Sequence, residues 1–90
     1  MGFDAAVAVL RGWLGRDVDV ALEPEGTRMS GRLSELDSTG TDGALFALDA
    51  QQLSGVAVAL FRDGVDSVRH EGDTLVVAQG QVTVTVTLAR

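Results

Sequence analysis

Cysteine is absent from the 90 residues, which excludes disulfide bonds and metal sites built from thiolates. Tyrosine is absent as well, and His70 is the single histidine, so the chain carries few groups suited to acid–base or nucleophilic catalysis. Lysine is also missing: all seven basic residues are arginine, and the net charge at pH 7 is −6. Because phosphate backbones repel an acidic protein unless its arginines cluster, the composition does not favour nucleic-acid binding.

Long apolar runs are missing too. No stretch approaches the roughly 18 apolar residues of a membrane span. The first four residues, Met-Gly-Phe-Asp, lack the basic segment and the apolar run of a signal peptide. We therefore expect a soluble cytoplasmic protein that makes no membrane contact.

Only four residues are aromatic, so valine, alanine and leucine must fill the core, and a valine-rich composition favours strands. A chain of this length makes one domain, residues 1–90, and buries only about 60–65% of the surface that its unfolded form exposes. The core is therefore thin, and we expect a homo-oligomer that buries more surface.

Residues 4–14 are predicted to form a helix. Asp4 is the expected N-cap, and Gly15 fits the left-handed position that ends a helix. The apolar stripe indicates either a membrane-surface or partner helix, or a helix that covers one end of a barrel. We favour the second, because the polar face is short and not basic. The stripe consists of Phe3, Val7, Leu10 and Leu14, with Ala6 and Trp13 beside it.

Residues 18–37 are predicted to form the first β-hairpin. Val18, Val20 and Leu22 alternate with other residues, which is the period of a half-buried strand. The turn 23–26 carries a proline and a glycine at the positions that turns favour. The returning strand has Met29, Gly31 and Leu33 on one face. Three further strands are expected at 44–48, buried on both sides, at 56–61, and at about 65–68.

Residues 74–89 are predicted to form a C-terminal hairpin. Its second strand, 82–88, alternates strictly between aliphatic residues and threonines, which is the clearest strand pattern in the chain. Such a β-prone and nearly uncharged segment is an aggregation hazard as a free edge. We therefore expect it to pair within the fold or with a neighbouring subunit.

Residues 4–70 resemble the Sm-like superfamily, which includes the Sm and LSm proteins and the bacterial RNA chaperone Hfq. Four segments carry the resemblance: Leu14–Leu22, Gly31–Asp37 with its G-x-hydrophobic-x-x-x-D pattern, Leu45–Gln51 and Phe61–Val68. The resemblance implies a mainly β fold, in which an N-terminal helix precedes a small, strongly bent, five-stranded SH3-like barrel over about 17–70. The C-terminal hairpin would be an addition to that barrel.

The same resemblance implies a ring of subunits joined edge to edge between the fourth and fifth strands, with a single-stranded RNA site on the loops after strands two and four. The chain departs from the family in these loops: residues 38–41 contain no aromatic side chain on which a base can stack, and Asp63 follows Arg62. Arg28 and Arg32 share a strand face and either form a small basic patch with Arg62 or Arg69, or pair with nearby carboxylates. The candidate nucleic-acid-binding residues are Arg28, Arg32, Asp37 and Arg62.

Two groups were considered for chemistry. Ser67, His70 and Asp73 contain the residue types of a catalytic triad, but they lie in one short segment beside a turn, as ordinary polar turn residues do. Asp37 and Asp42 lie in one loop that lacks the regular ligand spacing of a calcium loop. We expect no catalytic residue, no metal site and no cofactor.

Our first hypothesis is a non-enzymatic binding or assembly module that self-associates through sheet edges and contacts a protein partner. The second is a divergent RNA-binding ring, for which the arginines must converge on one rim. A small hydrolase is a third, and it requires a pocket that places His70 against a carboxylate.

Overall fold

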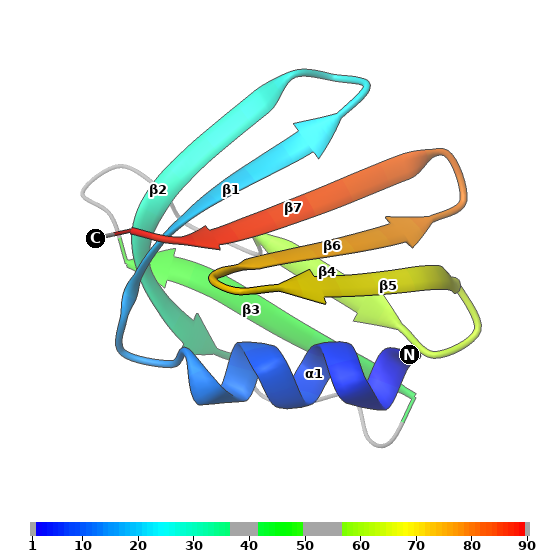
Figure 1. The fold of residues 1–90 in the computed structure, drawn as a ribbon, viewed down its shortest axis with the longest axis horizontal. Helices are drawn as coiled ribbons and strands as arrows, with labels where there is room; N and C mark the ends of the chain where they lie inside the picture. Colours follow the sequence, from blue (N-terminus) through cyan, green and yellow to red (C-terminus); the bar gives the residue numbers. More distant parts are fainter. Residues whose placement is uncertain (1, 37–41, 50–56, 90) are drawn as a thin grey trace.

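Seven antiparallel strands form one sheet in the computed structural model, which describes residues 2–36, 42–49 and 57–89 (Figure 1). A single helix precedes them, as the sequence predicts. The strand order is β4-β3-β2-β1-β7-β6-β5, with β4 and β5 at the two ends. The elements are α1 Phe3–Gly12, β1 Asp17–Glu23, β2 Thr27–Glu35, β3 Gly43–Asp49, β4 Val58–Phe61, β5 Val65–Glu71, β6 Thr74–Gln79 and β7 Val82–Leu88.

Two runs of consecutive hairpins make up the sheet. Strands β1 to β4 form the first run and β5 to β7 the second, and the pairing of β1 with β7 joins them. In this pairing Val20 lies opposite Val86 and Leu22 opposite Val84. The aliphatic face of β7 therefore continues the aliphatic face of β1, and both are buried by the same layer of side chains.

The expected five-stranded barrel with an added hairpin is wrong in strand number and in closure. The hairpin of β6 and β7 lies between β1 and β5 as part of the sheet, and the sheet is not closed by backbone pairing of β4 with β5. The physical reason is that β7 takes the free edge of β1, where it buries its own apolar face. The mainly β class, the N-terminal helix and the internal pairing of the 82–88 strand are confirmed.

Strand β2 changes partner along its length. Its first part, Thr27 to Arg32, pairs with β1, and its last part, Arg32 to Glu35, pairs with β3. The strand curves visibly between these two pairings (Figure 1). This curvature gives the sheet a concave face, and α1 lies against that face, where it contacts β4, β5 and β6.

The helix differs from its prediction at both ends. It begins at Phe3 after Gly2, an N-cap with no side chain to accept a hydrogen bond from the first turn, and it ends at Gly12. Asp4 is therefore inside the first turn and not the N-cap. Gly15 has the expected positive φ of 81°, but it lies beyond the helix, where its N–H donates to the Leu33 carbonyl at 2.9 Å. The chain has left the helix before Leu14, whose side chain is 37% exposed.

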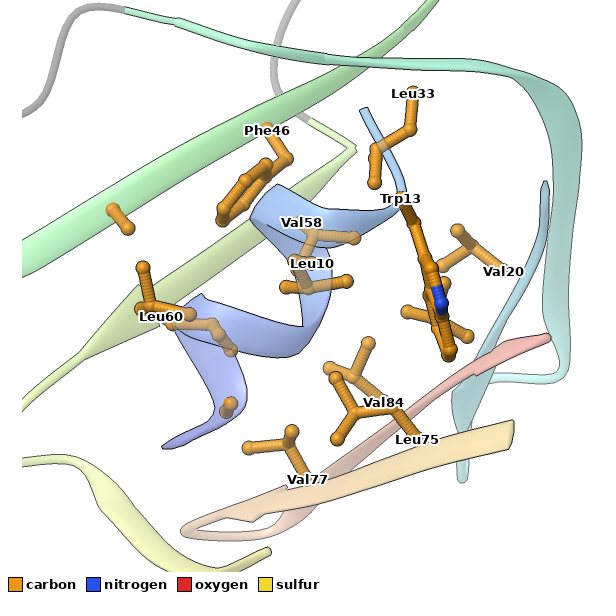
Figure 2. Close-up of a cluster of buried hydrophobic side chains, with 14 of the residues drawn as sticks. Leu10, Trp13, Val20, Leu33, Phe46, Val58, Leu60, Leu75, Val77 and Val84 are labelled. Carbon is orange, nitrogen blue, oxygen red and sulfur yellow. The ribbon is translucent and has the colours of Figure 1, made fainter. Parts of the chain in front are cut away.

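The core lies between α1 and the concave face of the sheet (Figure 2). Leu10 of the helix and Trp13, which directly follows it, pack there against Phe46, Leu60 and other strand residues that are almost completely buried. No polar or charged side chain is buried among the described residues. Because the core contains only apolar groups, the hydrophobic effect and close packing supply its stability.

The outward-facing side chains of β3 are less buried than the sequence predicted. Ala44, Phe46 and Leu48 point into the core, whereas Leu45 and Ala47 are half-buried on the other face. The expectation that this strand is buried on both sides is therefore wrong, because α1 covers only the concave face. The threonines of β7 share that outward face and are half-buried as well.

Strand β7 allows a matched test of this packing. Val86→Ala removes two methyl groups from a completely buried site, and we expect it to lower the free energy of unfolding by about 2 kcal/mol. Thr85→Ala, one residue away on the outward face, is expected to cost less than about 1 kcal/mol. Urea unfolding followed by Trp13 fluorescence measures both, and equal costs would contradict the assigned faces.

Candidate functional site

The arginines predicted to form one basic patch lie on separate surfaces. Arg28 and Arg32 are on the outward face of β2, as expected from their spacing. In the strand register Arg32 lies between Asp17 of β1 and Asp49 of β3. Between the two arginines, the Ser30 hydroxyl donates a hydrogen bond to the Asp19 carboxylate. Carboxylates are therefore interspersed with the positive charges on this face, which weakens its attraction for phosphate.

Arg62 lies in the turn between β4 and β5, beside the start of α1. Its guanidinium donates two hydrogen bonds of 2.9 Å to the Asp4 carboxylate and lies 3.7 Å from Asp42. It also stacks over the Phe3 ring, 4.7 Å from the centroid. These contacts fasten the helix N-terminus to the turn. The predicted RNA-binding residue Arg62 is thus occupied within the fold, and Asp37, the fourth candidate, lies outside the described residues.

The Arg62 contacts change the acidity of Asp4. Hydrogen bonds from Arg62 are the main cause that lowers the pKa of the Asp4 carboxyl, with the positive charge of Arg62 acting in the same direction and desolvation opposing both. The same pairing raises the pKa of Arg62, and a bidentate bond between Arg11 and Glu35 raises that of Arg11.

The residues of the suggested catalytic triad do not converge. His70 lies opposite Leu75 on the core side of β5, where its ring meets Trp13 edge-on at 5.8 Å, and its Nε2 bonds the Gly72 carbonyl at 3.0 Å. Ser67 pairs with Ala78, which lies on the other face of the sheet. Side chains on opposite faces cannot exchange a proton directly, so this nucleophile–base pair is not formed.

Metal binding receives no support from the described ranges, in which no three histidine or acidic side chains group around a common point. Asp42, one of the two carboxylates considered for calcium, is largely exposed and lies near Arg62. Asp37, the other, is outside the described residues.

A hollow lies at the end of the concave face where β1 ends and β7 begins. Its volume is about 770 Å³, within the range of small-ligand pockets. Most of its lining is apolar. The apolar residues come from β1, β7 and the segment 57–61 that contains β4, which are distant from one another in the chain. The lining includes Leu22, Ala57, Val58, Phe61, Val82 and Val84, together with Asp63, Asp66, Gln79 and the glycines Gly64 and Gly80.

Two apolar side chains of this hollow are open to solvent. Phe61 is 50% exposed and Val82 is 36% exposed. The carboxylate of Asp63 is exposed beside them, and Asp66 is exposed while it accepts a hydrogen bond from the Gly80 N–H at 2.8 Å. An apolar surface bordered by carboxylates suits a ligand that combines an apolar group with a positive charge.

The side-chain amide of Gln79 crosses from β6 to β4 at the edge of the hollow. Its Nε2 donates to the Ala59 carbonyl at 2.8 Å, and its Oε1 accepts from the Phe61 N–H at 2.9 Å. We call this pair of hydrogen bonds the Gln79 bridge. Sequence reasoning missed it, because a glutamine beside a Gly-Gln turn has no local pattern that indicates a bond to a residue 20 positions away.

No family model, curated protein or solved structure matched this chain in the three comparisons made. The resemblance to Sm-like proteins therefore stays a prediction that rests on the four sequence segments. Within the described residues, no helix has the length and apolarity to cross a membrane.

Asp4→Asn tests whether the Arg62 contact stabilises the fold through charge. Because the pKa of Asp4 is lowered on folding, the ion pair stabilises the protein above the unfolded pKa of about 4, and this contribution is lost as the pH falls through the folded pKa. We expect the urea midpoint of the wild type to exceed that of D4N at neutral pH and to equal it at about pH 2. If the two urea midpoints still differ in acid, Asp4 stabilises the fold by something other than its charge.

Proposed function

We propose that the protein is a non-enzymatic binding module whose hollow receives an apolar side chain of a protein partner, with a basic residue of that partner against Asp63. The observation that carries the proposal is the combination of an apolar hollow of about 770 Å³ with exposed Phe61 and Val82 at its border. Exposed apolar surface of this kind marks interaction sites in folded proteins.

Charge favours a basic partner. The chain has a net charge of −6. Two of its arginines, Arg11 and Arg62, each bind a carboxylate of the same chain. Asp63 makes no ion pair within 4.0 Å of any described side chain and borders the hollow. An acidic protein attracts basic segments over long distances, and carboxylates at the border of an apolar site select among them.

Self-association through sheet edges stays a prediction, and the two end strands carry features that oppose it. The Gln79 bridge occupies two backbone groups of β4. Strand β5 has an irregularity between Val65 and Ser67 and carries the charged residues Asp66, Arg69 and Glu71. Bulges and charges of this kind are the means by which edge strands avoid pairing with other chains. We therefore propose that the partner binds a single copy of the chain.

The mass of the protein in solution tests whether the chain is a monomer. Light scattering coupled to size exclusion is expected to give a mass near the 9.4 kDa of one chain. A mass of several chains would contradict the monomeric module and would favour the ring implied by the Sm-like resemblance.

A labelled basic peptide tests the binding site. The probe is a capped heptapeptide of alternating valine and arginine, and its acidic counterpart replaces each arginine by glutamate. We expect the basic peptide to bind and Asp63→Asn to weaken it about two- to fivefold, because exposed ion pairs contribute modestly. Asp17→Asn is the matched control, since Asp17 is also exposed but lies at the opposite end of β1 from Leu22.

The RNA-binding ring is the competing function, and the same titration separates it. Single-stranded RNA is expected to show no binding at moderate salt, because carboxylates accompany Arg28, Arg32 and Arg62. Tight, salt-sensitive RNA binding that is lost in Arg28→Ala and Arg32→Ala would overturn the peptide-binding module.

A further inference from the structure

Strand β4 is an end strand of the sheet and has one unpaired side. It pairs with β3 through residues 58–61, and the Arg62 N–H continues this pairing with a 2.8 Å bond to the Asp42 carbonyl. The Ala59 carbonyl and the Phe61 N–H are instead bonded to Gln79. These two groups therefore belong to the side of β4 that faces away from β3.

The Gln79 bridge reproduces what a neighbouring strand would supply. In a parallel pairing, one residue of the neighbouring strand donates its N–H to the carbonyl of residue i−1 and accepts at its own carbonyl from the N–H of residue i+1. The amide of Gln79 offers one donor and one acceptor to Ala59 and Phe61 at 2.8 and 2.9 Å, which are ordinary hydrogen-bond lengths. The Gln79 side chain thus satisfies the two backbone groups that a neighbouring strand would otherwise bond, and a strand can occupy this edge only by displacing it.

The hollow runs along this same edge. Ala57, Val58, Ala59 and Phe61 line it, and the other side is formed by Leu22 and the start of β7. An extended segment beside β4 projects alternate side chains to opposite faces, so its apolar residues enter the hollow while the residues between them face outward.

We propose that the partner segment binds as an added strand on β4 and displaces the amide of Gln79 from Ala59 and Phe61. This inference rests on the proposed function, because it specifies how the partner occupies the same hollow. The partner is an extended, basic and apolar-alternating segment of another protein. The exchange replaces two neutral hydrogen bonds by two others, so the apolar contacts in the hollow and the charge of Asp63 decide the binding free energy.

Backbone methylation of the probe isolates the added strand. Two further versions of the valine–arginine heptapeptide carry N-methyl groups at every second residue, one in each register, so that each edge of the peptide loses its N–H donors in one of them. We expect the unmodified peptide and one methylated version to bind, and the version methylated on the edge that faces β4 to bind at least tenfold more weakly. Hydrogen exchange at the Phe61 N–H is expected to slow on binding.

Gln79→Met removes the amide at nearly constant size, and Gln81→Met makes the same change in the exposed β6–β7 turn. We expect Q79M to bind the unmodified peptide about two- to tenfold more tightly, since the peptide no longer competes with the side chain, and Q81M to bind like the wild type. If Q79M fails to fold, the exchange measurement on the wild type still tests the added strand.

The outcomes distinguish this inference from the function on which it rests. If both methylated peptides bind as well as the unmodified one, strand addition is wrong and the binding module stands. If no basic peptide binds, the proposed function itself is overturned. Weaker binding by Q79M would show that Gln79 contributes to the site, and it would overturn the displacement.

Discussion

The pairing of β1 with β7 is the constraint on which the structure depends. Six residue pairs connect the run β1 to β4 with the run β5 to β7, and among the described residues no other backbone ladder links them. The ladder joins residues near the two ends of the chain, so neither run of hairpins completes the core alone. Val18 and Val20 of β1 are almost fully buried, and Leu88 and Val86 of β7 lie directly opposite them. Pairing between segments so distant in the sequence is of the long-range kind that slows folding.

The same constraint leaves the sheet open between its two ends. Because β7 and β6 stand between β1 and β5, the sheet has more strands than the expected barrel, and β4 and β5 do not pair through their backbones. Contacts of two kinds connect the runs on that side: the Gln79 bridge and the Arg62 turn with its bonds to Asp4. The apolar hollow next to the bridge is thus a consequence of incomplete closure, and the proposed binding site follows from it.

Electrostatics in this protein is largely internal. Two arginines hold α1 in place. Arg62, one of the residues predicted to bind nucleic acid, bonds Asp4 at the start of the helix, and Arg11 bonds Glu35 of β2 near its end. Exposed pairs of this kind add little stability individually, but they set the position of the helix relative to the sheet. The charges that remain at the hollow, Asp63 and Asp66, are negative, which is why we propose a basic segment as the partner.

The sequence by itself determined the type of each element and the face that β1, β2 and β7 bury, because side-chain periodicity reports local backbone geometry. The alternation in 82–88 predicted both the strand and its aliphatic inner face, and the helical spacing of Val7 and Leu10 predicted their burial. Only the tertiary structure decided that β7 pairs with β1, that Asp4 meets Arg62 58 residues away, and that Gln79 reaches β4. Several strands have apolar faces that β7 could match, so periodicity alone does not choose the neighbour. That choice depends on how the curved sheet and the helix together bury the most apolar surface, which no local pattern contains.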